Sequence, residues 1–109
     1  MSGQNTITQD LNAIGTGSSS GVQVYGGLYK YIVDATFGSS SEVSLEIGTG
    51  SSWVGVKDTL GNIVTNTATG ATEESFDVYI PTGLIRFTVG TATVASGNAY
   101  LSPIDVKIQ

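Results

Sequence analysis

The side chains that could do chemistry are limited in kind, because the 109 residues of this chain include no histidine and no cysteine. The commonest general base and proton shuttle is therefore missing, and so is the thiolate nucleophile. Serine and threonine are abundant, but no serine has the Ser-x-x-Lys spacing that activates a hydroxyl without histidine. The sequence therefore indicates no nucleophilic catalysis.

The acidic residues are the remaining candidates, as a catalytic pair or as metal ligands. Four of them alternate with apolar neighbours and are expected on the outward faces of strands: Glu42, Glu46, Asp77 and Asp105. A glycosidase needs an acid and a base that face each other, which solvated surface charges do not supply. Asp58 and Asn62 offer two oxygen ligands in one loop, fewer than a calcium loop uses, and the lack of histidine and cysteine argues against zinc. We expect no enzyme, no cofactor and no metal site.

The numbers of acidic and basic residues limit the kinds of partner that this protein is expected to bind. Four basic residues oppose nine acidic ones, which gives a net charge of −5. So few cations cannot neutralise several phosphates, and no nucleic-acid binding is expected. No run approaches the roughly 18 apolar residues of a membrane span, and the N-terminus lacks the basic and apolar regions of a signal peptide. We expect a soluble protein made inside the cell, with no membrane partner.

Beyond residue 21, short runs of alternating apolar and polar residues are separated by Gly, Ser, Asn and Asp clusters. The clearest run is Phe76–Val89, which continues on both sides of a turn at Pro81–Gly83 and predicts a hairpin of two strands. The best candidates for the core belong to it: Phe76, Val78, Ile80, Ile85, Phe87 and Val89. Further strands are expected at 22–25, 28–37, 42–47, 53–57, 62–66 and 99–108, with a turn at 38–41 and a polar loop at 67–73.

These runs amount to about eight strands at intervals near ten residues, which is typical of β-sandwiches and jelly rolls. Strands with one polar face favour antiparallel sheets, and a chain of 109 residues has room for one such domain. The sequence therefore predicts an all-β fold, a single antiparallel β-sandwich or jelly-roll-like domain at 22–109 with an N-terminal extended arm. The order of the strands does not follow from it.

Residues 1–21 differ from the rest of the chain. Ile7, Leu11 and Ile14 are spaced like the apolar stripe of a short helix that ends at Gly15, and the following Gly/Ser-rich stretch reads as a flexible linker. A helix of about three turns does not persist without docking. The segment is therefore expected to be either a disordered tail or an arm whose three apolar residues dock on a partner.

Two surfaces are candidates for binding. Six residues are expected on outward strand faces, five of them apolar, where they would form an oligomer or docking interface: Leu28, Ile32, Tyr79, Leu84, Arg86 and Leu101. The competing interpretation is that the phase of a strand is misassigned or that loops cover these residues. Aromatic residues could instead form a platform for a glycan: Trp53, Tyr25 and Tyr100, with Tyr79 beside them. Ordinary core and rim packing would also account for them.

Several segments resemble small structural proteins of tailed bacteriophages. The likeness is carried by Val78-x-Ile80-Pro81-x-Gly83, followed by Arg86-Phe87 and Gly90-Thr91. The run Gly27–Ile47 and the sequence Trp53-Val54 followed by Asp58 and Gly61-Asn62 are also similar to such proteins. Together these segments cover a little over half of the chain.

The resemblance implies a capsid decoration, or cement, protein. Such a protein lies on the outside of a mature phage head and bridges neighbouring copies of the major capsid protein, often as a trimer. It implies a virion protein made in the host cytoplasm, a homo-oligomer with a trimer favoured over a dimer, and docking through the arm. The alternative is a carbohydrate-binding or fibre or baseplate module of a phage or secreted protein.

Overall fold

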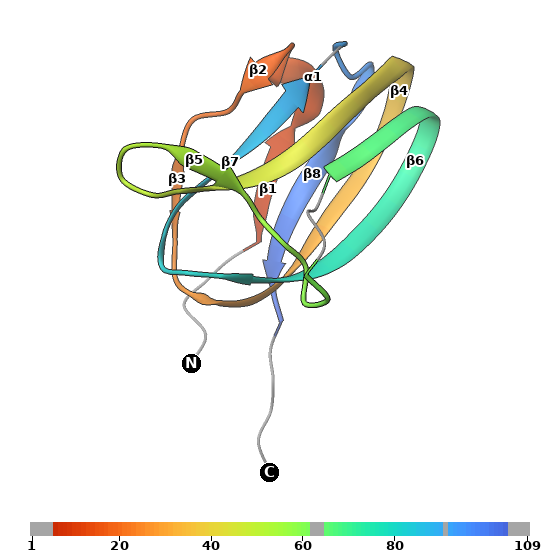
Figure 1. Cartoon of the computed structure of the whole chain (residues 1–109). Helices are drawn as coiled ribbons and strands as arrows, with labels where there is room; N and C mark the ends of the chain where they lie inside the picture. The colour runs from red at the N-terminus through yellow and green to blue at the C-terminus, as the bar shows by residue number, and fades with distance from the viewer. Residues whose placement is uncertain (1–5, 62–64, 91, 105–109) are drawn as a thin grey trace.

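The computed structural model describes residues 6–61, 65–90 and 92–104. In these residues the chain forms eight strands and one short helix (Figure 1): β1 (Ile7–Asp10), α1 (Leu11–Ile14), β2 (Gly17–Ser18), β3 (Val22–Val24), β4 (Gly27–Gly48), β5 (Trp53–Gly55), β6 (Thr65–Ile80), β7 (Gly83–Gly90) and β8 (Ser96–Pro103). All of the strand pairs are antiparallel. The predicted all-β, antiparallel sandwich is confirmed.

The 22-residue strand β4 belongs to both layers of the sandwich. Its first half pairs with β8 and β6, and its second half pairs with β7, β5 and the start of β6. We call β1, β8, the first half of β4 and most of β6 layer A; layer B contains β2, β3, β7, β5 and the second half of β4. The turn predicted at 38–41 is wrong: the strand continues, with a shift of register against β6 between Phe37 and Ser41. The strand pairs on both sides of this stretch keep it continuous, while the bulge bends it from one layer to the other.

The hairpin predicted at Phe76–Val89 is also wrong, although both of its strands exist. β6 pairs with β4, whereas β7 pairs with β4, β2 and β3, so Pro81 and Thr82 carry the chain from one layer to the other. Two strands with one apolar face each can bury those faces against each other across a core just as well as side by side in one sheet. The loop predicted at 67–73 lies within β6, where threonine suits an extended backbone.

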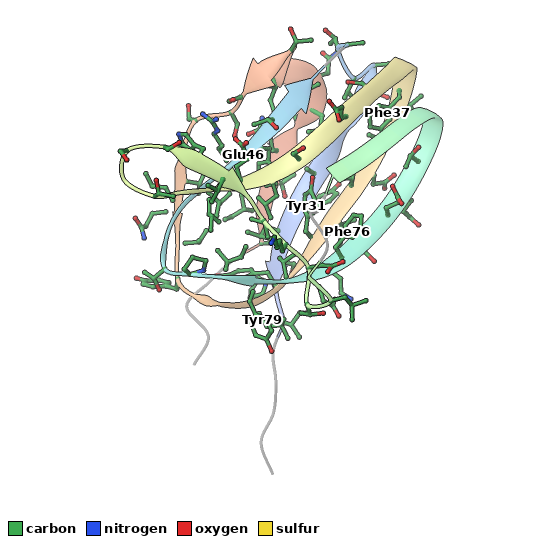
Figure 2. The ribbon with its side chains drawn as sticks, in the orientation of Figure 1. Tyr31, Phe37, Glu46, Phe76 and Tyr79 are labelled. Atoms are coloured by element: carbon green, nitrogen blue, oxygen red, sulfur yellow. The ribbon has the colours of Figure 1, made fainter. Side chains whose placement is uncertain are left out.

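The core lies between the two layers and follows the predicted alternation. The inward residues of β4 are buried: Tyr29, Tyr31, Val33, Ala35, Phe37, Val43 and Leu45. Of the six core candidates near the predicted hairpin, five are buried and Phe76 packs against them half-buried. The Tyr31 ring stacks on Phe76 with 5.9 Å between ring centres (Figure 2). It also stacks on Phe87 of layer B, with 6.1 Å between ring centres. These aromatic contacts join the layers.

Residues 6–21 are part of the sandwich, so the prediction of a separate arm and linker is wrong for them. β1 pairs with the edge of β8 and β2 pairs with β7. The helical stripe is confirmed only at Leu11–Ile14, where Asp10 caps the N-terminus and Gly15, at a φ of 71°, ends the helix. Leu11 is completely buried, and Ile7 and Ile14 pack against the core. These three apolar side chains therefore pack within their own domain. Residues 1–5 of the predicted arm lie outside the residues that the structure describes.

Candidate functional site

The outer face of layer B is built around Trp53, the one tryptophan of the chain. Trp53 of β5 is registered with Gly48 of β4, and its side chain lies over this glycine toward Leu84 of β7. A Cβ on Gly48 would lie 3.4 Å from Cζ3 of the indole, and a Cβ on Gly21 would lie 3.3 Å from Cη2. The two glycines therefore leave the space that the indole occupies.

Arg86 and Glu46 hold the indole from one side. The guanidinium carbon of Arg86 lies over the Trp53 ring, 4.4 Å from its centre. Nε of Arg86 donates a hydrogen bond of 2.7 Å to Oε1 of Glu46, the residue opposite it on β4. Both side chains of this ion pair are about a quarter exposed, at 26% and 23%. The charged partners are consequently shielded from solvent more than a surface pair is, and the guanidinium is held in place.

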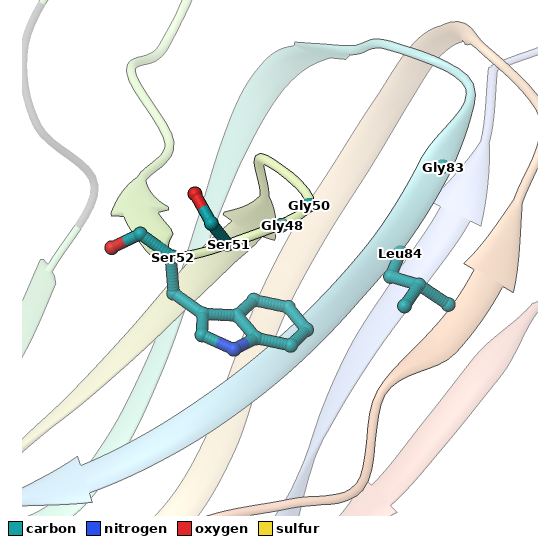
Figure 3. A pocket seen from close by; sticks show the side chains of 7 residues that line it. Gly48, Gly50, Ser51, Ser52, Gly83 and Leu84 are labelled. Atoms are coloured by element: carbon teal, nitrogen blue, oxygen red, sulfur yellow. The ribbon is translucent and has the colours of Figure 1, made fainter.

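A hollow of about 410 Å³ opens next to Trp53 (Figure 3). Its lining is mixed, with glycine backbone, hydroxyls and apolar side chains: Gly48, Gly50, Ser51, Ser52, Trp53, Gly83 and Leu84. The turn that carries the serines is fixed by the bonds from Thr49 N to Ser52 O (2.9 Å) and from Ser52 N to Thr49 Oγ1 (3.1 Å). Figure 3 shows Ser51 and Ser52 on one side of the hollow and Leu84 on the other.

The outer face of layer A brings together three of the six predicted interface residues. Leu28 is registered with Tyr79, and Ile32 lies on the same face four residues along β4. Tyr79 is 67% exposed, whereas Leu28 and Ile32 are half-buried. Between Leu28 and Ile32, on the same face, Nζ of Lys30 forms an ion pair of 2.6 Å with Asp77. A second hollow, of about 380 Å³, adjoins this pair and is lined by Lys30, Ile32, Glu73, Glu74 and Ser75.

The other three predicted interface residues lie elsewhere. Leu84 and Arg86 are on layer B, so the six residues do not form one patch. Leu101 is completely buried, and its assignment to an outward face is wrong. It is registered with Ile7 and with Tyr31, both of which face the core. β8 ends at Pro103, so the apolar residues that follow this proline do not indicate which face of the strand points inward.

The prediction that Trp53, Tyr25 and Tyr100 form one glycan platform is wrong. Trp53 lies on the outer face of layer B, whereas Tyr100 lies on that of layer A and accepts a hydrogen bond from Asn98 Nδ2 at 3.2 Å. Tyr25 follows β3 and is 66% exposed. The core of the sandwich separates the two outer faces, so no single ligand can span Trp53 and Tyr100. What the sequence reasoning missed is the contact of Trp53 with Arg86 and the ion pair of Arg86 with Glu46, which only strand register places together.

The remaining reactive groups offer little chemistry. Glu42 and Asp77 are exposed on outward faces as predicted, and Asp105 lies outside the described residues. Burial raises the pKa of the Tyr31 hydroxyl well above its usual range. Among the residues that the structure describes, no three carboxylates gather as metal ligands.

The same part of the chain contains no helix that could cross a bilayer. No protein family, curated protein or solved structure was found to match the chain.

Proposed function

We propose that this protein is a non-enzymatic structural protein of a virion that binds the outer surface of a phage head and stabilises contacts between major capsid subunits. The observation that carries the proposal is the outer face of layer A, where Tyr79, 67% exposed, is registered with half-buried Leu28, and half-buried Ile32 lies farther along the same face. Exposed apolar side chains grouped on one face commonly mark a surface that binds another protein. The resemblance of Phe76–Thr93 to phage structural proteins supports the same class of function.

The edge of β6 next to this face offers a second means of contact. β6 pairs with β4 along one edge. Along its other edge the described residues supply a bridge between Asp58 and Val78 and a bond from Thr59 N to Asp77 O, but no further strand. An uncovered strand edge can accept an extended segment of a partner by backbone pairing. A capsid subunit could therefore pair with β6 while its neighbour packs on Tyr79.

Binding of this kind would stabilise a capsid by mass action. A protein that binds only the mature lattice adds its binding free energy to the stability of that lattice. Many copies on a symmetric shell act together through avidity, and a symmetric homo-oligomer, a trimer or a dimer, would multiply the contacts of each copy. We assign Ile7, Leu11 and Ile14 no part in this docking, because Leu11 belongs to the core and the two isoleucines pack against it.

The test is co-sedimentation with capsids of the encoding phage from which this protein has been removed. Tyr79→Asp should lower binding at least tenfold, because it places a charge at the centre of the proposed contact. Val54→Asp is the control, since Val54 is 45% exposed but lies on β5 in the other layer. Circular dichroism would verify that both variants fold. Absence of wild-type protein from the capsid pellet would contradict the proposal.

A further inference from the structure

The far end of the Trp53 indole lies over Gly48 and Gly21. The atoms nearest to Gly48 and Gly21 are Cζ3 and Cη2, which belong to the outer edge of the benzene ring. Arg86 lies over one face of the ring at 4.4 Å. Trp53 is only half-buried, so part of the indole is left for another contact.

The hollow borders the indole. Trp53, Gly48 and Leu84 line the hollow, whereas Arg86 and Glu46 do not. Leu84 precedes Arg86 by two positions on β7, and Gly48 follows Glu46 by two positions on β4, so the hollow and the ion pair lie at opposite ends of the indole site. The ring therefore separates the hollow from the Arg86–Glu46 ion pair.

The ring is held in this orientation before any ligand arrives. Glu46 holds the guanidinium at 2.7 Å, and the guanidinium packs on the indole. Leu84 and the two glycines limit the motion of its rim. A binding surface that is already ordered avoids the entropy cost of fixing its side chains when the ligand binds.

The wall opposite Leu84 is polar but uncharged. Ser51 and Ser52 are exposed and offer hydroxyl groups that can both donate and accept hydrogen bonds. Gly48, Gly50 and Gly83 have no side chains, so a ligand can approach the backbone between the serines and the ring. The ligand that suits this lining has an apolar face, a rim of hydroxyls and no net charge.

We propose that this hollow is a saccharide-binding site. One C–H face of an uncharged pyranose packs on the part of the Trp53 indole that lines the hollow, and the sugar hydroxyls bond to Ser51, Ser52 and the neighbouring backbone. A volume of about 410 Å³ falls within the range of small-molecule sites, which is roughly 300–1,000 Å³. The net charge of −5 disfavours an acidic glycan. The site uses neither Tyr25 nor Tyr100 and does not depend on the proposed role in a capsid.

The binding experiment uses the full-length protein and a panel of uncharged trisaccharides of glucose, galactose, mannose and N-acetylglucosamine. Trp53 is the one tryptophan, so its fluorescence reports directly on the site. At least one trisaccharide should change this fluorescence saturably, and calorimetry should give the same affinity. Trp53→Ala should lower that affinity at least tenfold by calorimetry, the equivalent of about 1.4 kcal/mol.

Two further variants keep the result interpretable if Trp53→Ala fails to fold. The double variant Ser51→Ala/Ser52→Ala changes only exposed side chains of the turn and should lower the affinity several-fold. Tyr100→Ala, on the other face of the sandwich, should leave it unchanged. The proposal is overturned if no trisaccharide binds, if the double variant binds as tightly as the wild type, or if an apolar peptide binds the hollow instead. Capsid binding by the double variant would be unaffected in every case, which separates this site from the proposed docking surface.

Discussion

Gly97 of β8 lies so close to Ala35 of β4 that no side chain fits between the two strands. A Cβ on Gly97 would be 2.4 Å from Cα of Ala35 and 2.5 Å from the carbonyl oxygen of Asp34. The φ of Gly97 is +116°, a conformation that other residues rarely adopt. The two residues are registered partners, so this contact sets how closely β8 packs on β4 in layer A.

Gly97→Ala should therefore lower the free energy of unfolding by about 3 kcal/mol, since it combines a backbone clash with a strained φ. Gly61→Ala is the matched control: Gly61 has a φ of +89° but open space around its Cβ position, and its cost should be about 1 kcal/mol. Urea denaturation of the two variants gives the difference. Equal losses of stability in the two variants would mean that β8 can shift away from β4 without a cost in free energy.

Leu11→Ala should lower the free energy of unfolding by about 2–5 kcal/mol, because Leu11 is completely buried and its removal leaves a cavity. Ile14→Ala, at a half-buried position on the same short helix, should cost less. Thermal and urea unfolding followed by circular dichroism measure both effects. A Leu11→Ala variant as stable as the wild type would restore the interpretation of this segment as an arm that docks elsewhere.

Ser41→Ala should cost about 1–3 kcal/mol, because it removes a buried hydroxyl that lies within hydrogen-bonding reach of the carbonyl oxygens of Gly90 and Ala92. The same hydroxyl accepts a bond of 3.3 Å from Ala92 N, so it ties the end of β7 to the bend of β4. Ser75→Ala, an exposed position on β6, is the control and should change stability by less than about 0.5 kcal/mol. Chemical denaturation measures both losses of stability, and a loss for Ser75→Ala as large as that for Ser41→Ala would contradict the prediction.

Tyr31→Phe should raise the free energy of unfolding at neutral pH by about 1 kcal/mol. The Tyr31 hydroxyl is buried and has no hydrogen-bond partner among the described residues, so folding strips it of water without replacement. Phenylalanine retains the ring that stacks on Phe76 and Phe87. If the variant were less stable than the wild type, an internal water must bond to the hydroxyl.

The buried position of Tyr31 also makes the protein sensitive to alkali. Burial raises the pKa of its hydroxyl in the folded state, whereas in the unfolded chain it ionises near pH 10. Above about pH 10 the unfolded state has lost a proton that the folded state keeps, so the free energy of unfolding falls as the pH rises from there. Urea unfolding at several alkaline pH values should give a shallower decline for Tyr31→Phe, and identical declines would contradict the assignment.

The alternation of apolar and polar residues predicted one face of each long strand well. Tyr29 to Phe37 in β4 and Ile85 to Val89 in β7 point inward as expected, because a period of two is a local property of an extended backbone. The same reasoning failed at Leu101, where residues beyond the end of β8 set the wrong phase. The helical spacing that marked Leu11 as part of a docking arm was also misleading, since an apolar residue in a polar segment can be buried as readily in its own core as in that of a partner.

The sequence alone thus determined the fold class, the inward residues of the long strands and the scarcity of reactive groups. Only the tertiary structure decided which strands are neighbours, that β6 and β7 lie in different layers, and that residues 6–21 complete the sandwich. It alone brought Arg86 to Glu46, forty positions away, and Arg86 to Trp53. Backbone hydrogen bonds between strands are non-local and nearly indifferent to side-chain identity, so alternation defines two faces but leaves each strand's neighbours open.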